Sequence, residues 1–324
     1  MHFKSARIVA VGAALQDIYL IDHDDFGINA RGYFNQIELG SKIDIDRIFF
    51  SSGGGAINVA TTFARYGHTA VFMGAIARDP AGDAVIASLD EEGIDTSFIT
   101  YTDHYHTGCS VILLTPSGER SILTYRGSSG HFELIDAADL QQIYPDWLYV
   151  STLRANFSLL KRLFKTARKL GTKIMFNPGI LELKQPKKLL ELLPQVEVLI
   201  LNRDEARQLV TGSSLPELAA RIKNYAPITI ITNGRQGAIA TDRIATKETF
   251  RLGVYEDPPI LDATGAGDAF GSGFLAAYAS GKDFVSSLTF AAANSTAVVT
   301  KVGSRTAILS RQTRLHAFPI SPVR

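Results

Sequence analysis

A loop near the end of the chain combines residue types that can bind an anion. The run DATGAGD occupies positions 262–268, and an apolar pattern with helical spacing follows from Phe270 onward. Because Gly265, Ala266 and Gly267 have almost no side chain, their backbone N–H groups can approach a ligand closely, and the helix adds the positive end of its dipole. The loop therefore predicts a site for a phosphate group.

Asp268, at the end of this loop, is unexpected in an anion site. A carboxylate there costs free energy unless it has a chemical role. Accepting a proton beside a phosphoryl group is such a role. The simpler interpretation is that Asp268 caps the helix and the glycines serve a tight turn. The loop by itself does not decide between the two.

A second glycine-rich run, near the N-terminus, leads into another helix. It reads SGGGAINVA at 52–60, and its apolar spacing predicts a helix over 56–66. A glycine backbone lets a bound sugar lie close to the chain, and Asn58 offers both a donor and an acceptor to vicinal hydroxyls. The simpler interpretation is a glycine turn with a solvated asparagine.

The two runs resemble the C-terminal and N-terminal signatures of the ribokinase-like (PfkB) family of carbohydrate and nucleoside kinases, and further matches extend the resemblance over about residues 6–310. The resemblance implies a ribokinase-like α/β fold in one domain over 1–324: a doubly wound, mostly parallel sheet flanked by helices, with a small inserted β-sheet lid. It also implies ATP-dependent phosphorylation of an alcohol.

Roles for individual residues follow from the same resemblance. Asp268 is implied as the general base, and the backbone N–H groups beside it are implied to hold the charge that develops on the phosphoryl group. The loop residues implied in catalysis besides Asp268 are Gly265, Ala266 and Gly267. The residues implied in binding the acceptor are Asp17, Gly54, Gly55, Asn58 and Asn177.

On the nucleotide side, the residues implied are Asn202, Thr232, Gly234, Gly237 and Asn294. Glu205, in the Asn-x-x-Glu element at 202–205, is implied to act on Mg²⁺ through water, and one carboxylate suffices because Mg²⁺ usually keeps several waters. The alternative for Glu205 is a carboxylate favoured by the dipole at a helix start. Asp262 and Thr264 are implied to hold a monovalent cation, K⁺, as in some relatives.

The rest of the chain supplies the elements that this fold needs. A buried strand is expected at 8–12, and further strands at 147–150, 173–176, 196–201 and 228–231, separated by helical patterns such as 157–170 and 215–225. Alternating apolar and polar residues over about 16–51 and 98–127 predict the strands of the lid. Short strands at 36–39 and 42–46 belong to that expectation.

Composition limits the function classes. The chain has 324 residues, 46% hydrophobic and 20% charged, and its 33 Lys and Arg nearly balance its 32 Asp and Glu, so no global field favours nucleic acid or an anionic membrane. The single Cys109 excludes an internal disulfide and a multi-cysteine zinc site. The apolar run at 8–15 is too short to span a bilayer. A cytoplasmic protein is expected.

Two other nucleotide-binding motifs do not match. A dinucleotide fingerprint needs a third glycine where Phe270 stands, and a P-loop needs a Gly-Lys-Ser/Thr ending that occurs nowhere in the chain. A non-catalytic sugar- or nucleotide-binding relative is the alternative of another class. The presence of Asp268 argues against it, because binding alone needs no base there.

The identity of the acceptor substrate is what the sequence determines least. A primary hydroxyl of a ribose-like sugar is the first expectation, while an adenosine-type nucleoside, fructose and ketodeoxy-sugar acids stay open. Arg120, Arg126 and Arg154 are spare cations that could meet an acid or a phosphate, and the alternative is that they are ordinary surface residues. The lid is expected to cover the acceptor with one face and to pair with a second subunit through the other, which predicts a homodimer.

Overall fold

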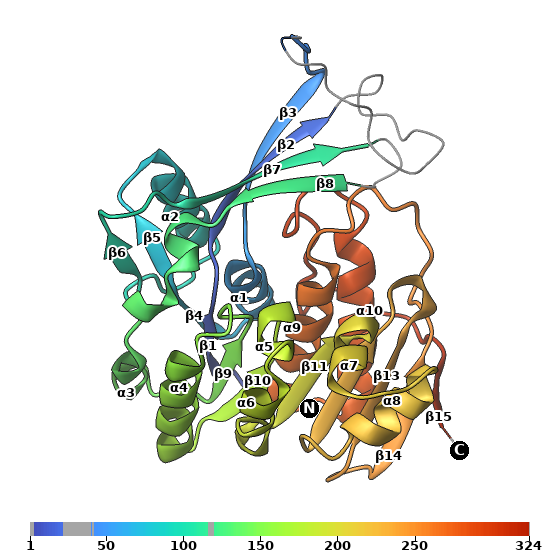
Figure 1. Ribbon diagram of the computed structural model, residues 1–324. Helices are drawn as coiled ribbons and strands as arrows, with labels where there is room; N and C mark the ends of the chain where they lie inside the picture. Colours follow the sequence, from blue (N-terminus) through green and yellow to red (C-terminus); the bar gives the residue numbers. More distant parts are fainter. Residues whose placement is uncertain (1–2, 22–39, 41, 116–119, 324) are drawn as a thin grey trace.

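Residues 3–21, 40, 42–115 and 120–323 are described by the computed structural model. Within them a central sheet has nine strands in the order β15-β14-β13-β12-β11-β10-β9-β1-β4 (Figure 1). Six strands pair in parallel: β4 (Thr69–Met73), β1 (Arg7–Val11), β9 (Trp147–Val150), β10 (Lys173–Phe176), β11 (Val198–Asn202) and β12 (Ile228–Thr232). Three antiparallel strands complete one edge: β13 (Ala238–Asp242), β14 (Glu248–Leu252) and β15 (Ile320–Pro322).

Helices cover both faces of this sheet, because its strands are apolar on both sides. In β1, Ile8 and Ala10 belong to one hydrophobic core, whereas Val9 and Val11 belong to the other. The first core is completed by α1 (Gly55–Tyr66), α2 (Pro80–Glu91), α9 (Ala266–Ala279) and α10 (Phe284–Val298). The second is completed by α3 (Leu140–Ile143), α4 (Phe157–Leu170), α5 (Ile180–Leu183), α6 (Pro186–Leu190), α7 (Arg203–Leu209) and α8 (Leu215–Ile222). The predicted doubly wound α/β fold is thereby confirmed.

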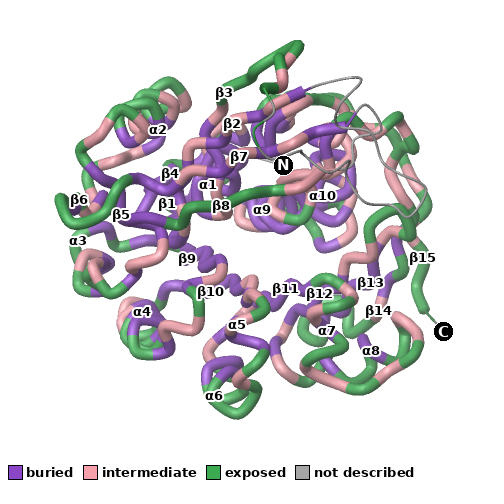
Figure 2. Tube along the Cα trace, turned by 45° about the horizontal axis from the view of Figure 1, so that its top comes forward, coloured by how far each residue is buried: buried purple, intermediate pink, exposed green. Residues whose placement is uncertain are grey.

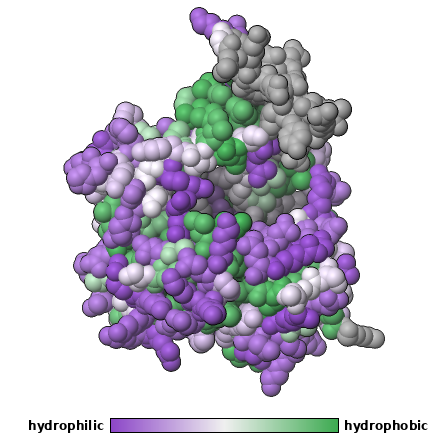
Figure 3. All heavy atoms as spheres, viewed as in Figure 1, coloured by the Kyte–Doolittle hydropathy of each residue, from purple (hydrophilic) through white to green (hydrophobic). Residues whose placement is uncertain are grey.

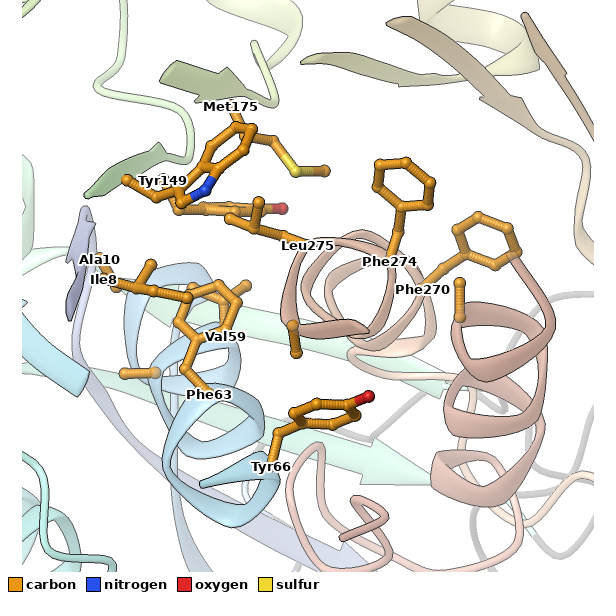
Figure 4. Close-up of a cluster of buried hydrophobic side chains, with 14 of the residues drawn as sticks. Ile8, Ala10, Val59, Phe63, Tyr66, Tyr149, Met175, Phe270, Phe274 and Leu275 are labelled. Atoms are coloured by element: carbon orange, nitrogen blue, oxygen red, sulfur yellow. The ribbon is translucent and has the colours of Figure 1, made fainter. Parts of the chain in front are cut away.

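The helix α9 is apolar on nearly all sides because it lies between the sheet, α1 and α10. Figure 4 shows Leu275 of α9, Phe63 of α1 and Tyr149 of β9 gathered in one cluster, and all three are fully buried. Burying one such side chain contributes on the order of 2 kcal/mol. At Gly273 a Cβ atom would lie 3.1 Å from the Cα of Ala291 in α10, so the glycine permits the close approach of the two helices. The helix α9 is therefore closely packed against α10.

Four strands form a second sheet, called here the small sheet, in the order β3-β2-β7-β8. They are β2 (Leu15–Ile21), β3 (Arg47–Gly53), β7 (Gly108–Leu114) and β8 (Arg120–Tyr125). Figure 2 shows its outer strands β3 and β8 as largely exposed. The two predicted lid segments therefore meet in one sheet. β5 (Ala75–Ala77) and β6 (Thr100–Thr102) form a separate parallel pair.

One predicted strand of the small sheet was wrong. Residues 42–46 have no regular structure, and β3 begins only at Arg47. Their alternation of Ile with Lys and Asp resembles a strand, but the described residues provide no neighbouring strand for them to pair with, and pairing decides a strand more than pattern does. The strand expected at 36–39 lies outside the described residues.

No helix in the described part of the chain is long and apolar enough to cross a membrane. Cys109 is a free, half-buried thiol on β7. The cytoplasmic location expected from the sequence stays a prediction.

Candidate active site

The two glycine-rich runs meet in space where α1 and α9 begin. Asn58 in the first turn of α1 donates from Nδ2 to Oδ2 of Asp268 in the first turn of α9, at 2.8 Å. Ser304 donates from its hydroxyl to Oδ1 of Asn58, at 2.9 Å. Asn58 is only 5% exposed, so these two bonds fix its amide. The Asp268 side chain is thus bound to Asn58, which does not fit the interpretation of Asp268 as a mere helix cap.

Asp268 has a more basic carboxylate than an ordinary aspartate. The residue is half-buried, and burial raises its pKa from 3.8 to about 6, while the hydrogen bond from Asn58 works in the opposite direction. Oδ2 is engaged by Asn58. A Cβ atom at Gly55 would lie 3.7 Å from Oδ1, so the start of α1 borders the space beside that oxygen.

The run at 262–268, called here the anion loop, has the backbone that its glycines predict. Gly265 is the residue before α9 and has φ 80°, a left-handed conformation, and a Cβ atom there would lie 2.7 Å from that of Ser304. At Gly267 a Cβ atom would meet nothing within 4 Å. The first N–H groups of a helix have no partner within it. Ala266, Gly267 and Asp268 therefore present N–H donors and the positive end of the α9 dipole towards open space.

Asp17 lies on β2 of the small sheet, facing the core, and is 5% exposed. Burial raises its pKa to about 6, the charge of Asp262 adds to this, and Ser110 and Arg305 lower it. Gly53 leaves room for this carboxylate, since a Cβ atom there would clash with Asp17 Oδ2. The structure therefore brings Asp17 beside the run at 52–60, as expected.

The other expected acceptor residues lie at the same end of the molecule. Gly54 precedes α1 and has φ 106°. Asn177 directly follows β10 and donates from Nδ2 to the carbonyl of Ile200, at 3.1 Å, which fixes the orientation of its amide. Both positions belong to the carboxyl edge of the parallel strands, where ligands of such sheets bind.

A cleft of about 330 Å³ opens next to the anion loop. It is lined by four of the residues expected on the nucleotide side, Asn202, Thr232, Gly234 and Gly237, together with Ala266 and Gly267. Apolar residues form much of the remaining wall, including Tyr255, Pro258, Ile260, Phe270, Ala292 and Val299. An apolar pocket with a few polar groups at one end is the usual form of a small-molecule site.

Asn294 does not contribute to this cleft, and its expected place there was wrong. Its side chain is fully buried, donating to the carbonyl of Ala269 and accepting from the N–H of Leu309, both at 2.8 Å. The neighbouring Ser295 and Thr296 line the cleft instead. On a helix, adjacent residues are rotated by about 100°, so a shift of one position exchanges a core residue for a cleft residue.

Glu205 closes a capping box at the start of α7: its Oε2 accepts from the N–H of Asn202 at 2.8 Å, and the Asn202 side chain accepts from the N–H of Glu205 at 2.9 Å. Burial raises the pKa of Glu205, and the charge of Asp268 adds to the shift. The helix-start interpretation is therefore correct for one carboxylate oxygen. Its own helix cap therefore accounts for one oxygen of Glu205, and Asn202 beside it lines the cleft next to the anion loop.

Sequence reasoning missed three residues that organise this region. Glu182 is fully buried and accepts from the N–H groups of Leu153, Ala155 and Gly179. Ser304 holds Asn58, as described above. Arg305, 8% exposed, donates to the carbonyl of Ser52 and to Thr61 Oγ1. None of the three residues belongs to either glycine-rich run. Only their tertiary contacts show which backbone and side-chain groups they position.

Comparison with known proteins defines the class. The chain matches the model of the "pfkB family carbohydrate kinase" over residues 5–311. It is 28% identical over 272 residues to ribokinase of Haemophilus influenzae, covering 82% of this chain and 86% of the relative. It is 29% identical over 248 residues to fructokinase of Salmonella typhimurium, covering 72% and 78%.

A solved structure agrees in fold. Ribokinase of Arabidopsis thaliana, solved with ribose and ATP, superposes with a TM-score of 0.79 at 21% identity and covers 95% of this chain and 97% of that chain. These matches define an α/β phosphotransferase that acts on an alcohol group. The chain belongs to the pfkB family of carbohydrate kinases.

Proposed function

We propose that this protein transfers the γ-phosphate of ATP to a primary hydroxyl of a sugar, with a ribose-like sugar as the first candidate. The observation that carries the proposal is the position of Asp268, a carboxylate of raised pKa at the edge of an anion loop, beside both a nucleotide-sized cleft and the acceptor residues. A protein that only binds sugar or nucleotide has no use for a base at this point.

In the proposed reaction, Oδ1 of Asp268 accepts the proton of the acceptor hydroxyl while the hydroxyl oxygen bonds to the γ-phosphorus. The bond from that phosphorus to the bridging oxygen breaks, and ADP leaves with the electron pair. The N–H groups of Ala266, Gly267 and Asp268 stabilise the charge on the phosphoryl oxygens. Asn58 holds the Asp268 carboxylate at Oδ2, so that Oδ1 faces the acceptor.

The residues present fit Mg²⁺ bound mainly through phosphate and water. No group of three or more His, Cys, Asp or Glu that could hold a metal occurs in the part of the chain that the structure describes. Mg²⁺ in phosphoryl-transfer sites takes one or two carboxylates and fills the rest with phosphate oxygens and waters. Glu205, with Asn202 beside it, is the carboxylate for this, and the ion would neutralise charge on the transferred group.

Glu205→Gln is expected to raise the Mg²⁺ concentration needed for half-maximal activity several-fold, because the amide has no charge to orient metal-bound water. Acceptor binding should change little, since Glu205 lies on the phosphate side. Activity titrated against Mg²⁺, with Asp204→Asn as the control on the same helix, measures the difference. An unchanged titration curve would leave Glu205 with its helix-capping role alone.

The acceptor is tested by a coupled assay of ADP release. Ribose, fructose, other pentoses and hexoses, adenosine and other nucleosides, ketodeoxy-sugar acids and sugar phosphates are compared by kcat/KM. Ribose or a close analogue is expected to give the highest value. A nucleoside preferred by tenfold or more would shift the proposal to an adenosine-type kinase, and ATP binding without turnover of any acceptor would favour a binding protein.

We also propose that the small sheet acts as the lid over the acceptor. Its inner face carries Asp17, and its buried Tyr19, Ile21, Ile112 and Leu114 pack with Val302. Covering the acceptor keeps out water, which would otherwise compete for the phosphoryl group.

The outer face of the small sheet is apolar, which supports a homodimer. One row across its four strands consists of Phe50, Ile18, Val111 and Leu123, as the strand register shows. Phe50 is 56% and Leu123 64% exposed, and hydrophobic side chains gather on this sheet in Figure 3. Large exposed apolar faces usually mark an interface. A second copy of the chain would cover this face with the same residues, as a two-fold interface requires.

Leu123→Lys is expected to shift the protein from dimer to monomer. In a two-fold dimer the substitution buries one unpaired charge from each subunit in the interface, and burying an unpaired charge costs free energy. Sedimentation velocity at micromolar concentration measures the change. Lys165→Glu, on the exposed side of α4, is the control and should stay dimeric. A wild-type protein that sediments as a monomer would remove the proposed dimer without affecting the kinase proposal.

A further inference from the structure

Asp262, at the start of the anion loop, is a fully buried carboxylate next to a cation from the small sheet. Its Oδ1 accepts from the N–H of Thr264 at 2.9 Å, and its Oδ2 from the N–H of Gly303 at 3.1 Å. Nε of Arg120, the first residue of β8, lies 3.8 Å from Oδ1. About a quarter of the Arg120 side chain is exposed, against 1% for Asp262.

Two hydroxyls, those of Tyr19 and Thr264, lie beside this carboxylate as well. The Tyr19 hydroxyl, Thr264 Oγ1 and Arg120 Nε are buried and complete no hydrogen bond with the described residues. Tyr19 faces Asp262 and Thr264, and burial together with the charges of Asp262 and Asp17 raises its pKa, so the phenol is neutral. Two hydroxyls, one N–H donor and one carboxylate thus share a small space, in which a bridging water would satisfy all of them.

The charges in this space already balance. Asp262 is opposed by Arg120, and the neighbouring Asp17 is opposed by the buried Arg305. A K⁺ ion at Asp262 would add an uncompensated positive charge a few ångströms from a guanidinium that cannot lose its proton, and a like charge at such distances is unfavourable in a buried site. The residues present therefore do not fit the monovalent cation that the family resemblance implied at Asp262 and Thr264.

We propose that Arg120 supplies the positive charge beside Asp262 in place of a monovalent cation, so that this kinase works without K⁺. Because Arg120 is on the small sheet and Asp262 is in the anion loop, the contact also ties closure of the small sheet to the loop that binds phosphate. Arg120 is thus a positioning residue. The proposal depends on the proposed kinase function only for its activity readout.

The test compares the wild type with Arg120→Met in 100 mM KCl and in 100 mM tetramethylammonium chloride, whose cation is much larger than K⁺ and carries only methyl groups on its surface. For the wild type we expect the Tm to agree within about 1 °C and kcat to differ less than twofold between the salts. For Arg120→Met we expect a lower Tm in tetramethylammonium and a K⁺-specific recovery of both Tm and activity. Arg47→Met, an exposed arginine on β3 of the same sheet, is the control and should match the wild type in both salts.

A wild-type kcat raised twofold or more by K⁺, or a wild-type Tm raised by K⁺ beyond the tetramethylammonium value, would overturn the proposal. So would an Arg120→Met variant that matches the wild type in both salts. If Arg120→Met does not fold, the wild-type comparison decides alone. The Tm readout needs no turnover, so a failure to find any phosphorylated acceptor would overturn the kinase function while leaving the cation result interpretable.

Discussion

Asp268→Asn is expected to lower kcat by about a hundredfold or more, the usual contribution of a positioned base. The amide keeps the shape of the side chain and can still accept the hydrogen bond from Asn58, but it cannot take a proton from the acceptor. Nucleotide affinity should stay near the wild-type value, since the N–H groups of the anion loop are unchanged. Steady-state kinetics and calorimetric ATP titration measure the two quantities.

The pKa of Asp268 adds two checks to this experiment. Since the base must be ionised, wild-type log kcat should rise with pH through about 6 and level off above it. The folded pKa lies above the ordinary 3.8, so ionisation above pH 6 costs the folded state free energy, and Asp268→Asn should be at least as stable as the wild type at pH 8. Near-normal turnover by the folded variant would remove the proposed mechanism.

Glu182→Met is expected to destabilise the protein by about 3 kcal/mol or more. The buried Glu182 carboxylate accepts from Leu153 N, Ala155 N, Gly179 N and the Thr152 hydroxyl, at 2.8–3.0 Å. Removing the acceptor leaves these donors unsatisfied, and each buried unsatisfied donor costs about 1–3 kcal/mol. The bonds also hold a loop in which Arg154 and Ala155 have positive φ angles of 54° and 61°, a backbone conformation that costs non-glycine residues free energy.

Urea denaturation followed by tryptophan fluorescence and by circular dichroism measures this loss. Glu191→Met is the matched control, because Glu191 forms only an exposed ion pair with Lys161, and such pairs contribute less than about 1 kcal/mol. Equal losses for the two variants would mean that the Glu182 bonds carry no special stability. Activity per folded molecule should fall for Glu182→Met as well, since the loop lies at the same carboxyl edge as Asn177.

The sequence by itself determined the fold class and the chemistry of the anion loop. Short apolar strands between helical patterns define a doubly wound sheet because each strand must bury both faces. The run at 262–268 is readable because it is local: glycine backbone, helix start and acidic residue are neighbours in the chain. Asp17 and Asn58 could be placed near Asp268 only through the family resemblance, since nothing in the sequence states which distant segments meet.

Only the tertiary structure decided what each polar side chain contacts. Asn58 holds Asp268 across 210 positions, and Asn294 faces the core where its neighbours face the cleft. Whether residues 42–46 form a strand depended on a pairing partner, which a pattern of alternation does not reveal. Glu182 and Arg120 look like ordinary surface charges in the sequence, because burial and the groups around a charge depend on the packing of distant elements. Because of that packing, Glu182 accepts the hydrogen bonds of a loop and Arg120 lies beside Asp262.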